Sequence, residues 1–209
     1  NGSVEFNEDD FTYLESKYPS RLLQINNDDI INEDLEEYLK IGINQEIPER
    51  YKCKKRNNWY VIPNIASIPD AFFFKRSHHY PKLLKNNTNA LVTDSAYKVN
   101  VRNGFDLNSL IFSFYNSLTL TFSEIDGRYY GGGVLELTPN EFKNLPIPYL
   151  SINKQEFVEF VNRFETKNDI DEVLNINDNI ILRSVLKLPS SDIKKIQNIR
   201  QKLISKRMR

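Results

Sequence analysis

The stretch Arg128-Tyr-Tyr-Gly-Gly-Gly-Val-Leu-Glu-Leu137 predicts the organisation of the chain around it. Three of the seven glycines of the protein are adjacent at positions 131–133. Glycine adopts backbone angles that other residues avoid, and it lets another backbone approach closely. We therefore expect a backbone-exposing loop, held between a preceding helix and a short strand over 134–137.

The residues after this strand predict the start of a helix. Thr138, Pro139 and Glu141 have the spacing of a helix N-cap, its first position and its third position. This combination is a capping box with a proline in the first turn. The glycine loop itself has two interpretations, a tight structural turn or a contact with a ligand such as a phosphate. It lacks the spacing of a dinucleotide fingerprint and the Lys-Ser/Thr pair of a P-loop.

Length and composition are those of a globular protein. The 209 residues fit one large domain, or one domain with a helical appendage. No apolar run reaches the roughly 18 residues of a membrane helix and no secretory signal is present, so we expect a cytoplasmic protein without a membrane partner. The single cysteine, Cys53, has no internal disulfide partner. Because the only methionine is Met208 and Asn1-Gly2-Ser3 resembles a processing remnant, we expect a piece of a longer polypeptide.

The formal net charge of zero conceals a strong segregation along the chain. Residues 1–49 carry 13 acidic and 3 basic side chains, whereas residues 50–104 carry 2 acidic and 11 basic ones. Residues 105–149 have a balance of −3, and residues 150–209 a balance of +4. The local field governs phosphate binding, so the neutral total does not argue against a nucleic-acid partner.

The pattern of residues predicts an α+β fold, with a twisted, mostly antiparallel sheet and packed helices, followed by a helical C-terminal tail. Residues 1–49 form an acidic lead-in, residues 50–149 a basic α+β core, and residues 150–209 a helical tail that packs on the core. In the lead-in, Asp28–Ile41 predicts a helix that Asn32 caps and Gly42 stops.

Aromatic and β-branched residues predict the strands of the core. They are concentrated in 59–63, 71–76 and 90–101, with prolines and asparagines between them. Basic residues interleaved with these aromatics favour phosphate contact. The alternative is that the lysines only keep edge strands from aggregating.

Helical spacing dominates the second half of the chain. Asp106 caps a continuous helix that runs toward Phe122. In the tail, Asn153 or Ser151 begins a helix that buries Phe157 and Phe160, and shorter helices follow over 169–174 and 178–186. The last helix opens at 189–192, carries Ile193, Ile196, Ile199 and Leu203 on one stripe, and ends in Lys206, Arg207 and Arg209, which suit a helix C-terminus.

The sequence contains no self-contained catalytic apparatus. His78-His79 is the only histidine pair, and no His or Cys cluster stands at metal-ligand spacing, so we expect no metal site. No Ser/His/Asp arrangement and no carboxylate pair is placed for catalysis. We therefore expect no catalytic residues, and the composition is that of a binding module.

Several blocks of the chain have a distinctive composition and order, beginning with Tyr51-Lys-Cys-Lys-Lys-Arg-Asn-Asn-Trp-Tyr-Val-Ile-Pro63. This segment is similar to a Y-K-x-R-x-x-W-Y-x-x-P segment of the group of adenine-specific DNA methyltransferases of restriction–modification systems, of the Type I and Type IIG kinds. Pro69–Phe74, Asn86-Asn87 and Thr93-Asp94 follow in the same order. Arg128–Pro139 with Leu145-Pro-Ile-Pro148 resembles its Y-G-G-G…L-P-I-P block, and 193–207 resembles its closing helix.

This resemblance implies a C-terminal target-recognition region, with residues 50–149 as its core. In that family the catalytic half lies upstream and holds S-adenosylmethionine and an Asn-Pro-Pro-Tyr/Phe motif. No Asn-Pro-Pro occurs in this chain, so the resemblance implies no cofactor in this part and two partners, double-stranded DNA and the upstream catalytic domain.

Candidate DNA contacts follow from the basic residues and from the glycine loop. Lysines and arginines neutralise phosphates, and some Arg, Asn or Gln side chains must read base edges in the major groove. The candidates are Lys52, Lys54, Lys55, Arg56, Lys75, Arg76, His78, His79, Arg102, Arg128, Tyr129, Tyr130, Gly131, Gly132 and Gly133. The candidates for base reading are Arg56, Arg76, His78, His79 and Arg128.

Two other classes of function remain open from the residues alone. A protein-docking module would use the acidic helix and the C-terminal helices to bind a partner subunit. An RNA-binding domain would use Trp59, Tyr60 and the run Phe72–Phe74 as stacking platforms.

Overall fold

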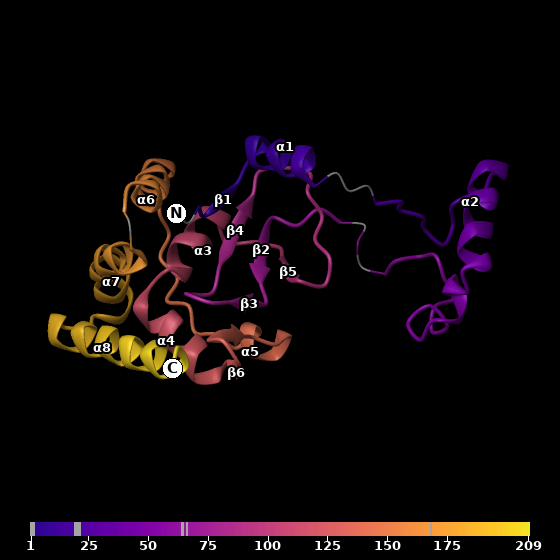
Figure 1. Ribbon diagram of the computed structural model, residues 1–209. Helices are drawn as coiled ribbons and strands as arrows, with labels where there is room; N and C mark the ends of the chain where they lie inside the picture. The colour runs from indigo at the N-terminus through magenta and orange to yellow at the C-terminus, as the bar shows by residue number, and fades with distance from the viewer. Residues whose placement is uncertain (1–2, 19–21, 64, 66, 168) are drawn as a thin grey trace. The chain divides into compact units, whose positions relative to one another are not determined.

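The computed structural model describes residues 3–18, 22–63, 65, 67–167 and 169–209. Asn1 and Gly2, which the sequence suggested as a processing remnant, lie outside the described residues. The elements, in chain order, are β1 Glu5–Phe6, α1 Glu8–Lys17, α2 Glu33–Asn44, the 3-10 helix η1 Ile47–Glu49, β2 Ala71–Phe74, β3 Arg76–Ser77, β4 Leu83–Asn86, β5 Ala96–Val99, α3 Leu107–Phe114, α4 Ser117–Asp126, β6 Arg128–Tyr130, β7 Val134–Glu136, α5 Pro139–Lys143, α6 Lys154–Thr166, α7 Ile170–Leu186 and α8 Ser190–Arg207 (Figure 1).

The chain forms two compact units. Unit 1 contains residues 1–12 and 69–209, and unit 2 contains residues 13–68. Unit 2 is therefore inserted into the sequence of unit 1. These boundaries differ from those of the three segments predicted from the sequence. The roles given to those segments stay predictions.

Two small sheets lie in unit 1. The first has the strand order β1-β4-β2-β5, with β1 parallel to β4 and the other pairs antiparallel. The second has the order β3-β7-β6 and is antiparallel throughout. The predicted α+β class with mostly antiparallel strands is confirmed. The strand predicted over 90–101 is limited to β5, and β4 was not predicted.

The core of unit 1 joins the first sheet to the helices. Phe73 of β2 is fully buried and stacks on Phe142 at 3.9 Å between ring centroids. Tyr115 is also fully buried, and its hydroxyl donates to the carbonyl of Leu83 at 2.9 Å and accepts from the Leu83 N–H at 3.1 Å. Burial raises the pKa of this hydroxyl far above its ordinary value, so it remains a donor. One phenol therefore satisfies both backbone groups of a strand residue that water does not reach.

The helix predicted from Asp106 toward Phe122 is two helices, α3 and α4. Asp106 caps α3 as predicted, and the chain breaks at Tyr115 and Asn116. The Asn116 side chain accepts from Thr119 N–H at 2.9 Å and donates to the Ser113 carbonyl at 2.7 Å. Asparagine competes for backbone hydrogen bonds in this way, so it ends one helix and caps the next.

The C-terminal tail contains three helices, α6, α7 and α8. The Asn153 cap of α6 is confirmed, with a capping box to Glu156. The two short helices predicted over 169–186 are one helix, α7, which carries the buried Asp178 in its interior. Asp178 accepts from Ser117 N–H at 2.7 Å and from Gln197 Nε2 at 2.8 Å. Ser117 and Gln197 therefore satisfy the carboxylate of Asp178, the residue at which the sequence predicted a second short helix to begin.

Figure 1 shows α6, α7 and α8 along one side of unit 1, beside α3 and α4. Contacts join α6 to α3, α7 to both α6 and α8, and α8 to α4. The tail thus packs against helices as well as against the sheet residue Lys85, whose Nζ lies 5.2 Å from the Phe157 ring.

Unit 2 contains α2 and the 3-10 helix. Asn32 caps α2 as predicted, but the helix begins at Glu33 rather than Asp28 and continues past Gly42 to Asn44. A Cβ at Gly42 would lie 2.4 Å from the Trp59 ring, so glycine here permits close approach of that ring. The strand predicted over 59–63 is wrong, because these residues form turns and irregular chain without strand pairing.

The last turn of α8 is anchored by a buried ion pair. Arg207 donates from Nε and Nη2 to the two carboxylate oxygens of Glu124, each at 2.8 Å. The two side chains are 0% and 2% exposed. Arg207 was predicted only as a favourable charge at a helix C-terminus. Its burial places it instead among the packing residues of α8, with Ile193 and Arg200.

Replacing Arg207 by Met is expected to lower the free energy of unfolding by about 3–5 kcal/mol, because Glu124 would be buried without a counter-charge. The double variant R207M/E124L should recover much of this loss, since it removes both charges. Urea unfolding of the four proteins in a double-mutant cycle measures the coupling.

Lys206→Met is the matched control, since Lys206 is the exposed neighbour of Arg207 in the same helical turn. Its change should stay within about 0.5 kcal/mol. Equal costs for the Arg207 and Lys206 variants would contradict the assigned role of the ion pair.

Candidate nucleic-acid interface

The glycine loop is the turn of a β-hairpin. Strands β6 and β7 pair with Tyr130 opposite Val134, and Gly131–Gly133 connect them. The helix expected before the loop is α4, which ends at Asp126, but the strand β6 between that helix and the glycines was not predicted. The predicted capping box of α5 is confirmed, with Thr138 N–H donating to Glu141 Oε2 at 2.7 Å. A short strand and an immediate helix cap therefore fix one end of the hairpin.

Two of the three glycines are required by the turn geometry. Gly132 and Gly133 have φ of +75° and +72°, in the left-handed region that favours glycine. A Cβ on Gly133 would lie 2.8 Å from Met208 Sδ, whereas Gly131 has open space around it. His78 Nε2 donates to the Gly132 carbonyl at 3.0 Å, and this bond ties the tip of the turn to the segment after β3.

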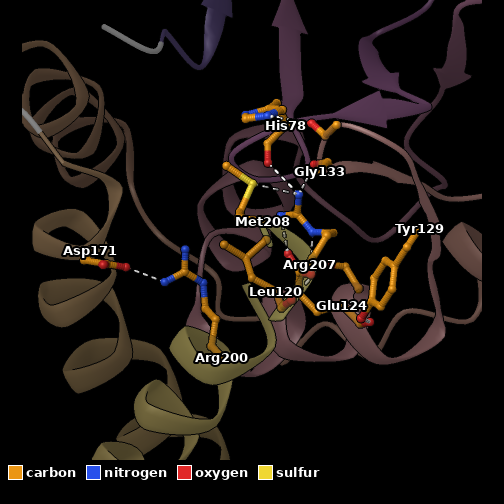
Figure 2. Close-up of polar contacts among 11 residues, drawn as sticks. His78, Leu120, Glu124, Tyr129, Gly133, Asp171, Arg200, Arg207 and Met208 are labelled. Atoms are coloured by element: carbon orange, nitrogen blue, oxygen red, sulfur yellow. Dashed lines mark hydrogen bonds and ion pairs between the residues drawn. The ribbon is translucent and has the colours of Figure 1, made fainter. Parts of the chain in front are cut away.

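Arg207 connects the hairpin to the C-terminal helix (Figure 2). Its Nη1 donates to the carbonyl of His78 at 2.7 Å and to the carbonyl of Gly133. Nε and Nη2 are held by Glu124 of α4. One buried guanidinium thus joins α8, α4, the chain after β3 and the glycine turn, and it holds the turn against His78.

The outer face of the three-stranded sheet carries two arginines beside carboxylates. We call Arg76, Arg128, Tyr130, Glu136 and Glu141 the hairpin face. Glu136 of β7 lies opposite Arg76 on one side and opposite Arg128 on the other. Arg76 Nε donates to Glu136 Oε2 at 2.5 Å, and Arg128 Nε donates to Glu141 Oε1 at 3.0 Å. The Arg76 guanidinium also lies 5.8 Å from the Tyr130 ring centroid.

These ion pairs keep the hairpin face charged. The hydrogen bond to Glu136 raises the pKa of Arg76, and the hydrogen bond to Glu141 raises the pKa of Arg128. The Thr138 backbone N–H and then Arg128 lower the pKa of Glu141. Both arginine side chains stay exposed, at 69% and 61%, whereas the two carboxylates are 16% and 19% exposed. The charges of the two arginines are therefore exposed to solvent, whereas the carboxylates that hold them are partly covered.

Beside the hairpin face lies a cleft of about 770 Å³, which we call the basic cleft. Among its described lining residues, Arg76, Lys82 and Lys167 carry positive charge and Asp169 negative charge. Lys82 Nζ lies 5.7 Å from the ring of Tyr80, whose pKa is raised by burial. The lining residues are Phe74, Arg76, Ser77, His78, His79, Tyr80, Lys82, Leu84, Phe164, Lys167, Asp169, Ile170 and Val173.

Most of the predicted contact residues of unit 1 are brought together here. Arg76, His78 and His79 line the basic cleft, and the His78 and His79 rings meet edge to face at 4.9 Å. Arg128, Tyr130 and the glycines belong to the hairpin, while the Tyr129 hydroxyl donates to the Glu124 carbonyl.

Other predicted residues lie elsewhere. Lys75 follows β2, and its Nζ lies 5.2 Å from the Tyr97 ring. Arg102 follows the opposite end of the β2–β5 pair, where Val101 N–H donates to Asp70 Oδ2. It is therefore separated from Lys75 by the length of the strands.

The four basic residues Lys52, Lys54, Lys55 and Arg56 belong to unit 2, in a segment of turns. Lys54 pairs with Glu49 at 2.6 Å, and Lys55 Nζ donates to the Tyr51 hydroxyl at 2.7 Å. Arg56 donates to the Trp59 carbonyl at 3.2 Å, so it helps to order this segment.

Sequence reasoning missed Lys82 and Lys167 of the basic cleft, and it missed Arg207 beneath the hairpin. For Arg207 a signal existed. Ile193, Arg200 and Arg207 follow one another at every seventh residue, so burial of Ile193 predicts burial of the others. For the two lysines no local signal exists, because they come from a loop after β3 and from the end of α6.

No group of three or more His, Cys, Asp or Glu side chains in the described ranges is placed to hold a metal ion. Among the described helices, none combines the length and apolar character needed to cross a bilayer.

Comparison with protein-family models identifies the chain as part of a restriction–modification DNA methyltransferase. The matching family is the C-terminal domain of the Type II methyltransferase M.Eco57I, and the match covers residues 2–182. The chain belongs to this family. Neither the curated proteins nor the solved structures gave a match. At the level of the family, the resemblance found in the sequence is confirmed.

Substituting Ala for each glycine of the turn is expected to separate their roles. G132A and G133A should each lower the free energy of unfolding by about 1–2 kcal/mol, because an L side chain is strained at positive φ. G131A should change it by less than about 0.5 kcal/mol. Urea unfolding of the three variants measures this, and equal effects at all three positions would contradict the turn geometry.

Proposed function

We propose that this chain recognises the DNA target of an adenine-specific DNA methyltransferase. The observation that carries the proposal is the basic cleft beside the hairpin face, in a chain that belongs to a DNA methyltransferase family. Cationic side chains neutralise phosphates and set the register of a protein on DNA. Lys82 and Lys167 would contact the backbone, and the hairpin would lie over the groove.

The methyl transfer itself is assigned to an upstream catalytic domain. That domain would bind S-adenosylmethionine and methylate N6 of an adenine turned out of the helix. The 209 residues hold no Asn-Pro-Pro motif and no glycine-rich donor loop, so they do not fit a methyl-donor site. This part of the protein contributes binding and position, and no step of the reaction is derived from it.

The burial of the run Phe72–Phe74 argues against its use as a stacking platform for RNA bases. Phe72 and Phe73 are 4% and 0% exposed and belong to the core, so only Phe74, at 36%, is available to a base. A base stacks on an accessible ring, so two of the three phenylalanines are not available, whereas Trp59 and Tyr60 are partly exposed.

Duplex DNA of mixed sequence is expected to bind the chain at low salt and to dissociate as salt rises, as measured by fluorescence anisotropy. Reversing both cleft lysines, K82E/K167E, should weaken binding to all sequences. It should also lower the slope of log K against log salt by about two, since each lost phosphate contact contributes about 0.9.

Lys202→Glu is the control for these reversals, because Lys202 is exposed on α8 and does not line the cleft. If K82E/K167E lost no more affinity for DNA than the Lys202→Glu control, a role for the cleft would be contradicted. Absence of DNA binding at low salt would overturn the proposed function, and stronger binding to single-stranded RNA would favour an RNA-binding domain.

A further inference from the structure

We infer that Arg76 and Arg128 read guanine bases, while the lysines of the basic cleft bind phosphates without regard to sequence. This inference rests on the proposed function and adds to it the class of base that the hairpin face recognises. It divides the cationic residues by their geometry, which the sequence does not do.

The first argument is the way each arginine is held. Arg76 and Arg128 both use Nε to bind a carboxylate, at 2.5 and 3.0 Å. A guanidinium is planar, so fixing Nε to a support also limits the direction of both Nη groups. Four N–H donors remain on the Nη atoms of each arginine. Such a fork matches the O6 and N7 acceptors that guanine presents in the major groove.

The second argument is that the supports are themselves fixed. Glu136 lies in the middle strand of the sheet, paired on both sides. Glu141 accepts the capping hydrogen bond of α5 through Oε2 while Oε1 binds Arg128. Base reading requires side chains held by a supporting shell, because a loosely placed donor discriminates poorly.

The third argument is the spacing across the sheet. Arg76 and Arg128 occupy the strands on either side of β7, so their backbones lie about 10 Å apart, twice the distance between neighbouring strands. Successive bases of one strand rise about 3.4 Å, so this separation corresponds to about three base steps. The two arginines are therefore placed to contact different base pairs.

The lysines have a different character. Lys82 and Lys167 are flexible chains that end in a compact charge, which suits phosphate better than a planar base edge. Lys167 pairs with Glu172 at 3.2 Å, and Lys82 lies over Tyr80. Neither arrangement fixes the direction of several donors at once.

The experiment uses duplexes that the 209-residue chain selects from a random-sequence library. In each selected duplex, single guanines are replaced by 7-deazaguanine, which keeps O6 and loses the N7 acceptor. We expect the replacement to weaken binding about tenfold or more at one or more positions for each arginine. Arg76→Ala and Arg128→Ala should each remove the sensitivity at a separate position.

Glu136→Met, which removes both the negative charge and the oxygen that accepts from Arg76 Nε, supplies a readout that charge alone would not produce. Removing a negative charge should raise the affinity for unselected DNA, while the loss of the Arg76 support should reduce the effect of 7-deazaguanine. If Arg76 acted only through its charge, the affinity would rise and the selectivity would stay unchanged. Lys82→Ala is the matched control, with weaker binding to every duplex and an unchanged response to 7-deazaguanine.

The outcomes separate the two proposals. Failure of the chain to bind any duplex at low salt would overturn the proposed function. Sequence-selective binding that is insensitive to 7-deazaguanine, or whose sensitivity survives in both arginine variants, would overturn the guanine assignment alone. Urea unfolding of each variant confirms that the exposed substitutions leave the fold intact.

Discussion

The buried guanidinium of Arg207 constrains more of unit 1 than any local pattern in the sequence. A charge that water does not reach needs a counter-charge and a full set of hydrogen-bond partners. Glu124 supplies the counter-charge, and the carbonyls of His78 and Gly133 complete the set. These partners come from a helix, from the segment after a strand and from a turn, so they must all assemble for the charge to be buried. The packing of α8 and the geometry of the hairpin therefore depend on each other.

The cationic surface around the hairpin combines rigid and flexible groups. Arginines that share the small sheet with carboxylates have fixed planes, whereas the lysines of the cleft keep their freedom. A glycine turn allows this arrangement, because residues with a Cβ rarely adopt the positive φ of Gly132 and Gly133, and a Cβ on Gly133 would also meet Met208. The backbone conformation of the glycine turn thus helps to fix the strands that carry Arg128 and Glu136.

The features that the sequence predicted correctly depend on neighbours within a few residues. The capping box of Thr138 and the helix start at Asn153 are of this kind, because the capping partners of each lie in one turn. The errors depend on distant partners. Asp178 stays inside a helix because Ser117 and Gln197 satisfy it, and Arg207 is buried because Glu124, far away in the sequence, opposes it. At the candidate interface, residue type identified the arginines and histidines near the hairpin, but only the fold could add the cleft lysines or place Arg102 apart from them.

The family match ends at residue 182, whereas the ion pair joins Glu124 to Arg207 of α8. This arrangement matters for anyone who exchanges C-terminal domains between related methyltransferases. A junction chosen at the end of the matched segment would separate the two charges and combine Glu124 with a foreign helix. Transplanted pieces should therefore extend through the last turn of α8, so that donor and acceptor travel in the same fragment.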